Sequence, residues 1–158
     1  MLSVGLTVAV IGLAACGDDA RDAGTAPDVE ASTPPATESG EAILINTRIS
    51  FVEEPFTGEV LNGSSIGDSP LCPSGTFSDQ HGNDEIGSVD RTFSCPEGRL
   101  RIGFTPGEPQ GQTQSGPWKI LSGTGAFEEL QGSGQMEVTY DPDNDMKGSE
   151  RFTGTIAR

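Results

Sequence analysis

From residue 43 onward, apolar and polar residues alternate with the period of two that is typical of β-strands. In the first stretch, Ile43, Ile45 and Ile49 lie on one face and Asn46 and Arg48 on the other. No segment of this part has a helical period. The alternation predicts eight short strands, over residues 43–51, 56–61, 76–78, 89–95, 99–105, 118–120, 136–140 and 152–156.

Turn-forming residues separate the predicted strands. They are Asn62-Gly63, Gly82-Asn83, Pro96-Glu97-Gly98, Pro106-Gly107 and the run 141–145. Short strands at this spacing indicate a sandwich or a barrel. We predict that residues 43–158 form an all-β domain, a small antiparallel β-barrel of about eight strands. At that size, side chains fill the interior or leave room for one small ligand.

One tripeptide occurs twice, as Phe56-Thr57-Gly58 and as Phe152-Thr153-Gly154. We interpret each glycine as a bend in a strand at a barrel corner, where a missing side chain permits sharp coiling. Chance recurrence in a chain rich in Gly and Thr is the alternative.

The N-terminal residues 2–15 form an uncharged, largely apolar run that ends in Leu13-Ala14-Ala15-Cys16. It is shorter than the ~20 residues of a membrane-spanning helix and fits the apolar region of a secretory signal. The run resembles the bacterial lipobox, which implies that residues 1–15 are a lipoprotein signal peptide and that Cys16 carries the lipid. Since signal peptides begin with basic residues and none precedes Arg21, we expect the natural start to lie upstream. A buried apolar segment with a chance cysteine is the alternative.

Residues 16–42 are predicted to be a disordered acidic linker. Between residues 17 and 41 there are seven acidic residues, one basic residue and no aromatic residue, so the segment cannot bury enough apolar surface to fold. The whole chain carries a net charge of −15. That charge argues against nucleic acid as a partner, because binding to phosphates depends on Lys and Arg. We expect a protein of the bacterial cell envelope that is attached through Cys16 to the outer face of a membrane, or is exported.

Cys72 and Cys95 are predicted to form a disulfide. They are an even pair once Cys16 is assigned to lipid, and an exported protein meets oxidising conditions. A redox or metal-binding thiol pair is the alternative, but the chain has no Cys-x-x-Cys spacing.

The stretch from Pro117 to Gly134, PWKILSGTGAFEELQGSG, resembles the allene oxide cyclase and dirigent-like β-barrels. It is more similar to bacterial secreted barrel proteins of uncharacterised function that share a GTGxFxxLxGxG signature. The segments CPSG at 72–75 and FSCPEG at 93–98 also fit these bacterial relatives. The resemblance implies a calycin-like barrel. In the plant families the lumen binds a reactive intermediate and steers ring closure or radical coupling, but none of their catalytic residues matches a position in this chain.

The signature also has a direct physical interpretation as a barrel-corner motif. Gly123 and Gly125 permit positive φ where the chain turns over the barrel end. One helical turn over residues 126–130 would place Phe127 and Leu130 on a shared face that plugs this end. Gly132 and Gly134 then allow close contact with the next strand.

Candidate chemical groups are few. His81 lies in the polar segment 79–85, which we interpret as a loop with an exposed histidine rather than a general base. Asp141, Asp143 and Asp145 resemble the start of a calcium loop, but Met146 and Phe152 occupy positions that require Gly and Glu. An acidic hairpin turn is the better interpretation. Arg99 and Arg101 are expected to face solvent and pair with surface carboxylates.

We therefore predict no catalytic, cofactor-binding or metal-binding residue. The expected function is that of a cell-envelope lipoprotein whose non-catalytic barrel binds a small apolar ligand or a protein partner. A cyclase or isomerase acting in the barrel lumen is one alternative, and a purely structural envelope component is another.

Overall fold

The computed structural model describes residues 40–83, 85 and 87–158. The predicted signal peptide, Cys16 and all but the end of the predicted linker lie outside these residues. The described part contains the following elements: β1 (Glu41–Ser50), β2 (Thr57–Val60), β3 (Ser65–Ile66), β4 (Ser69–Pro70), β5 (Thr76–Asn83), β6 (Gly87–Cys95), β7 (Gly98–Phe104), β8 (Thr113–Gly123), the 3-10 helix η1 (Gly125–Phe127), β9 (Gln131–Asp141) and β10 (Asn144–Ala157). No helix among them has the length and apolar character of a membrane span.

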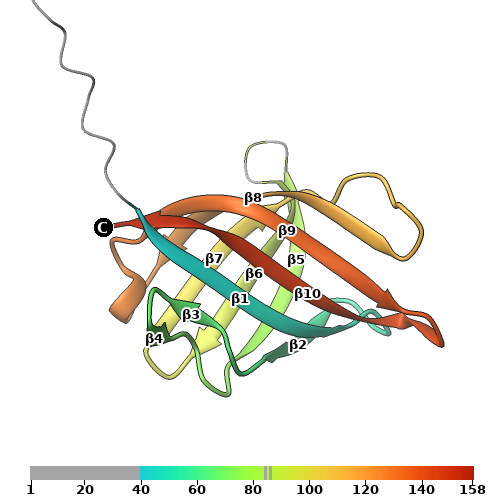
Figure 1. Cartoon of the computed structure of the whole chain (residues 1–158), viewed down its shortest axis with the longest axis horizontal. Helices are drawn as coiled ribbons and strands as arrows, with labels where there is room; N and C mark the ends of the chain where they lie inside the picture. Colours follow the sequence, from blue (N-terminus) through green and yellow to red (C-terminus); the bar gives the residue numbers. More distant parts are fainter. Residues whose placement is uncertain (1–39, 84, 86) are drawn as a thin grey trace, which may run out of the picture. The chain divides into compact units, whose positions relative to one another are not determined.

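Eight of the strands form a closed antiparallel barrel (Figure 1), as the alternation pattern predicted. Neighbours follow the order β1, β2, β5, β6, β7, β8, β9 and β10, and β10 pairs back onto β1. This closing pair runs from Glu41 opposite Ile156 to Ser50 opposite Lys147. The short strand β3 extends the wall beside the first half of β1, where Ile66 lies opposite Ile43.

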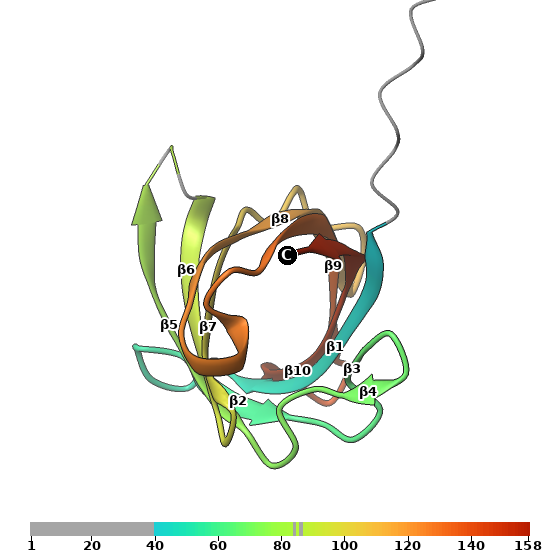
Figure 2. The same ribbon diagram turned by 90° about the vertical axis from the view of Figure 1, so that its left-hand side faces the viewer.

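The two ends of the barrel differ. At one end, the chain between β8 and β9 folds into η1, which curls across the ring of strands (Figure 2). The η1 segment is held there because Ala126 N donates to Glu97 O at 3.1 Å and Thr124 N donates to Arg99 O at 2.8 Å. We call this the η1 end. The opposite end, where the β1–β2, β7–β8 and β9–β10 connections lie, we call the mouth.

Alternate residues of the wall strands point into one shared core, as the alternation predicted. On β1, Ile43, Ile45 and Ile49 are buried. Other strands contribute aromatic and aliphatic side chains to the same cluster, and these include Phe77, Phe93, Leu100, Ile102, Phe104, Trp118, Met136, Val138, Phe152 and Ile156. Rings from different strands meet edge to face in the centre, where Phe152 lies 5.4 Å from Phe104 and 6.5 Å from Trp118.

Four strands, β5, β8, β9 and β10, are much longer than the sequence pattern predicted. The turn expected at Gly82-Asn83 is wrong, because β5 continues through both residues and Asn83 pairs with Gly87. The apolar alternation is lost there since the inward position 79 is a charged residue. Strand β8 likewise begins at Thr113, before the predicted start at residue 118. The buried position in this added part is Gly116, and a glycine provides no apolar signal. Strands β3 and β4 were not predicted, since each is only two residues long.

Both glycines of the repeated Phe-Thr-Gly tripeptide lie where strands approach closely. A Cβ atom at Gly58 would lie 2.0 Å from Arg48 O, and one at Gly154 would lie 2.2 Å from Ser133 O. Neither residue has positive φ. These positions therefore need glycine for space, as expected of tightly coiled barrel strands.

Candidate functional site

A cluster of charged side chains lies inside the barrel. Arg91 on β6 has a fully buried side chain and pairs with Asp79 on β5 and Glu150 on β10. Its Nε donates to Asp79 Oδ1 at 2.6 Å and its Nη2 to Asp79 Oδ2 at 2.7 Å. Nη1 and Nη2 also donate to the two carboxylate oxygens of Glu150. Thr47 on β1 completes the cluster by donating to Glu150 Oε2 at 2.7 Å.

Aromatic rings surround the guanidinium group of Arg91. Its Cζ lies 3.8 Å from the centroid of the Phe77 ring, 5.0 Å from that of Phe104 and 5.4 Å from that of Phe152. The ring faces attract the cation, and the rings exclude water from its ion pairs. Burial opposes the charge on Arg91, but the carboxylates of Glu150 and Asp79 outweigh it and raise the pKa of the guanidinium.

The cluster does not balance its charges. Two buried carboxylates share one guanidinium, so the interior carries one excess negative charge when both acids are ionised. Burial raises the pKa of Asp79 above its ordinary value of 3.8, against the lowering effect of Arg91, and the negative charge of Glu150 raises it further. Burial therefore favours the protonated form of Asp79 more than water does.

A pocket of about 420 Å³ lies at the mouth and reaches Asp79. It is lined by Glu54, Pro55, Phe56, Asp79, Gln80, His81, Ser88 and Val89. Residues 54–56, which precede β2, form the lip of the pocket. This segment lies alongside β5, because Asp79 N donates to Phe56 O at 2.8 Å. Pro55, Phe56 and Val89 provide apolar walls, and the buried carboxyl of Asp79 marks the inner end. The volume falls within the ~300–1,000 Å³ range of small-molecule sites.

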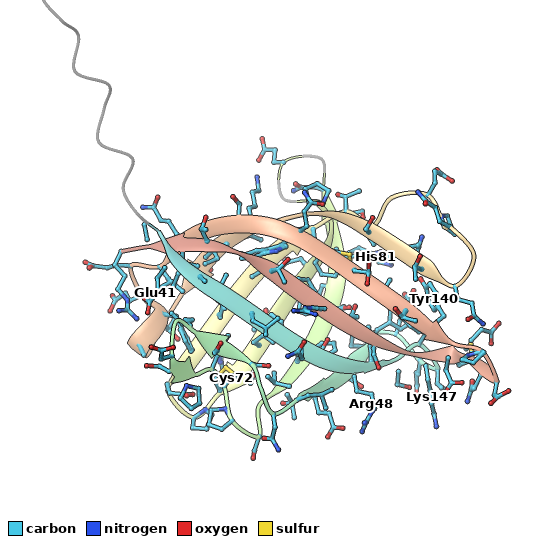
Figure 3. The ribbon with its side chains drawn as sticks, viewed as in Figure 1. Glu41, Arg48, Cys72, His81, Tyr140 and Lys147 are labelled. Atoms are coloured by element: carbon cyan, nitrogen blue, oxygen red, sulfur yellow. A yellow bond between two sulfur atoms is a disulfide. The ribbon has the colours of Figure 1, made fainter. Side chains whose placement is uncertain are left out.

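Aromatic side chains reinforce the same end of the barrel. Phe56 packs edge to face on Phe51, with ring centroids 5.4 Å apart, and Phe51 lies 5.5 Å from Tyr140. Tyr140 donates its hydroxyl hydrogen to Gln114, and burial raises its pKa. Figure 3 shows Tyr140 and His81 toward this end, with Cys72 and Glu41 toward the other.

His81 is exposed, as predicted, with 88% of its side chain accessible. Its expected position in a loop is wrong, since it lies on β5 opposite Val89. His81 Nε2 lies 3.3 Å from Glu54 Oε2 across the lip of the pocket. This histidine is therefore part of the pocket wall.

The three aspartates of the expected acidic hairpin turn lie at the β9–β10 connection. Asp141 and Asp143 belong to the β9–β10 hairpin, where Asp143 N donates to Asp141 Oδ1 at 2.9 Å. Asp145 follows as the second residue of β10. Among the described residues, no group of three His, Cys, Asp or Glu side chains is arranged to hold a metal ion. Arg99 and Arg101 are exposed, as expected. The expected surface carboxylate is wrong for Arg101, because its partner Asp90 has a side chain only 7% exposed.

The predicted disulfide between Cys72 and Cys95 is confirmed, with the two Cα atoms 4.7 Å apart. It joins the segment after β4 to the end of β6. The η1 end of the barrel thus carries the crosslink, and the mouth pocket lies at the opposite end.

The barrel-corner motif folds largely as its glycine and apolar spacing predicted. Phe127 and Leu130 are both buried beneath η1, and they plug that end. The expectation of positive φ is met at Gly125, at +62°, and is wrong for Gly123. Gly123 instead gives room to the chain, since a Cβ there would lie 1.9 Å from Phe127 O.

The two final glycines of the motif behave as expected at the β9–β10 contact. A Cβ at Gly132 would lie 2.5 Å from Thr155 O, and one at Gly134 would lie 1.9 Å from Thr153 O. The motif therefore shapes the η1 end and contributes no residue to the mouth pocket.

The three charged residues of the interior were not predicted from the sequence. A signal was present, because each lies two positions from a phenylalanine and so shares its face of the strand. These pairs are Asp79 with Phe77, Arg91 with Phe93, and Glu150 with Phe152. Two acids and one base on inward faces of three strands could have been recognised as a buried ion cluster.

Comparison with protein-family models, curated proteins and solved structures finds no match to this chain.

Proposed function

We propose that this protein is a cell-envelope lipoprotein whose barrel is a non-catalytic binding module for a small, largely apolar molecule. The observation that carries the proposal is the mouth pocket, in which Pro55, Phe56 and Val89 form apolar walls around one buried carboxyl. The mouth of a β-barrel is a common place for such a site. The resemblance of residues 117–134 to barrels whose lumen binds a reactive intermediate supports a binding role.

The interior of the barrel supports a binding role rather than a catalytic one. Both oxygens of Asp79 accept hydrogen bonds from Arg91, and Glu150 accepts from Arg91 and Thr47. Among the described residues, no buried side-chain nitrogen or oxygen lacks a hydrogen-bond partner. A network in which every group is satisfied is stable and specific, and it leaves no free base at the inner end of the pocket.

A dye-binding measurement tests the site. N-phenyl-1-naphthylamine is uncharged and fluoresces more strongly in apolar surroundings, so it should brighten on binding to the full-length protein. Val89→Phe fills one wall of the pocket and should weaken this binding at least tenfold. Val52→Phe is the matched control, because Val52 is exposed and lies outside the pocket. Equal binding by both variants, or no binding by the natural sequence, would contradict the proposal.

A cyclase or isomerase acting at the mouth is the second candidate function. It is favoured by Asp79, a largely buried carboxyl of raised pKa that lines the pocket. A carboxyl that holds its proton can act as a general acid toward a bound substrate. Turnover of an apolar epoxide or polyene that Asp79→Asn abolishes, without loss of dye binding, would favour this enzyme over the binding module.

Membrane attachment through Cys16 is the remaining part of the proposal. The supporting features are the lipobox-like sequence before Cys16 and the acidic linker after it. A single acyl chain anchors weakly, whereas two or more give stable attachment. Mass spectrometry of the mature protein should find a diacylglyceryl group on Cys16, and Cys16→Ala should release the protein from membranes. An intact, unmodified segment 1–16 in the mature protein would contradict attachment.

A further inference from the structure

We infer that the molecule bound at the mouth carries a positive charge next to its apolar body, as an amine or a quaternary ammonium compound does. This inference rests on the proposed binding function and specifies the ligand of the same pocket. Three features of the described residues carry it: the polar groups of the lining, the charge of the interior cluster, and the aromatic wall.

The polar groups of the lining favour a cation. Glu54 and Asp79 both line the pocket, Glu54 with 60% of its side chain exposed and Asp79 with 8%. Among the described residues that line it, none is Lys or Arg. Arg91 lies behind Asp79, but it is fully buried and its three nitrogens all donate to Asp79 or Glu150. Of the described lining residues, His81 is the one with a basic side chain, and it already lies 3.3 Å from the carboxylate of Glu54. An anionic ligand would therefore meet two carboxylates and a histidine that is paired with one of them.

The interior cluster supplies the second argument. When both acids are ionised, Arg91 balances only one of its two carboxylate partners, and the excess negative charge lies in a low-dielectric interior, where it is costly. Asp79 is the member of the cluster that lines the pocket. A cation seated against Asp79 would balance the excess charge, whereas an uncharged ligand would leave it and an anion would increase it.

The wall of the pocket suits the rest of such a molecule. Pro55 and Val89 offer aliphatic contact, and Phe56 offers an aromatic ring. The face of an aromatic ring attracts ammonium groups, and this is the basis of quaternary ammonium recognition in aromatic sites. Glu54 has 60% of its side chain exposed, so it can meet an incoming cation at the lip before the apolar body enters.

Three probes that share one ring system separate charge from apolar contact. Isothermal titration calorimetry of the full-length protein would compare 1-naphthylmethylamine, 1-naphthalenemethanol and 1-naphthoate at low ionic strength and pH 7. We expect the ammonium probe to bind about tenfold more tightly than the alcohol, because one charge-assisted hydrogen bond contributes about that factor in affinity. The carboxylate probe should bind more weakly than the alcohol. Glu54→Gln should reduce the preference for the ammonium about threefold or more.

Glu53→Gln is the matched control, because it makes the same change in net charge at an exposed neighbour outside the pocket. It should leave the preference unchanged. Equal affinities for the ammonium and the alcohol would overturn the inferred charge while leaving the binding function intact. An equal effect of the two glutamine variants would also overturn it, since the attraction would then come from the acidic surface as a whole. If none of the three probes binds, both the binding function and the inferred charge fail.

Discussion

Replacement of Arg91 by methionine is the most informative perturbation of this barrel. Methionine fills much of the same space, but it removes the only cation that contacts Asp79 and Glu150 among the described residues. Two carboxylates would then remain in an interior formed largely by phenylalanine rings. Within the described part of the chain, Thr47 would be the sole side-chain donor left to Glu150.

The magnitude follows from burial. Breaking a buried ion pair by removing one partner costs about 3–5 kcal/mol, because a charge is left without its counter-ion. Arg91 serves two such partners through four hydrogen bonds, so we expect a loss of at least ~3 kcal/mol at pH 7. The loss should shrink as the pH falls, since burial raises the pKa of Asp79 and a protonated Asp79 no longer needs the cation. A domain of this size has about 5–15 kcal/mol of stability in total.

Urea unfolding followed by tryptophan fluorescence measures this loss, because the single tryptophan, Trp118, is buried in the core. Arg48→Met is the control. Arg48 is 63% exposed and pairs with Glu59 on the surface, and exposed ion pairs contribute ~0–1 kcal/mol. If Arg91→Met cost no more than such an exposed pair, about 1 kcal/mol or less, the buried cluster would not stabilise the fold as its burial and hydrogen bonds require.

A compensated variant separates charge from packing. If Arg91→Met is combined with Asp79→Leu and Glu150→Met, no buried charge remains in the cluster. Apolar replacement of a whole buried ion cluster is often neutral or stabilising, so the triple variant should recover most of the lost stability. A triple variant less stable than Arg91→Met alone would show that side-chain shape dominates.

Three further predictions concern the same barrel. Burial raises the pKa of Asp79 in the folded state, so its ionisation costs stability as the pH rises above 3.8. The Asp79→Asn variant avoids this cost. Its stability relative to the natural protein should therefore improve between about pH 4 and 7 in urea titrations. Cys72→Ala combined with Cys95→Ala opens a link across 23 positions and should cost about 3 kcal/mol in the chain-entropy account, whereas a change below about 1 kcal/mol would contradict that account. Phe127→Ala should cost about 3 kcal/mol or more through the cavity left under η1, and thermal unfolding would show no shift if this plug were dispensable.

Much of the fold could be predicted from the sequence because alternation marks the residues of the interior. Ile43, Ile45 and Ile49 on β1 and Leu100 and Ile102 on β7 repeat with a period of two, and all are buried. The disulfide was predictable because two cysteines remain once Cys16 is assigned to lipid, and because export was expected. The plug at the η1 end was predictable from the spacing of its two apolar residues.

The candidate site was not predictable to the same degree, because its inward residues are polar. Asp79 and His81 interrupt the apolar alternation on β5, so the second half of that strand has the pattern of a loop. Arg91 is of a residue type usually found at the surface, and only its three-dimensional neighbours, Asp79 and Glu150, make its burial tolerable. Such pairings join residues 12 and 59 positions apart, and local patterns carry no information about them.

The position of a bound ligand on the barrel is the most direct test of a binding site at the mouth. Two-dimensional ¹H–¹⁵N spectra of the labelled full-length protein, titrated with 1-naphthylmethylamine, would locate it residue by residue. We predict shifts concentrated at the backbone amides of residues 54, 56, 79–81, 88 and 89, which line the pocket, with the η1 segment unchanged. Shifts spread over the outer face of the barrel, or centred on η1, would contradict a site at the mouth.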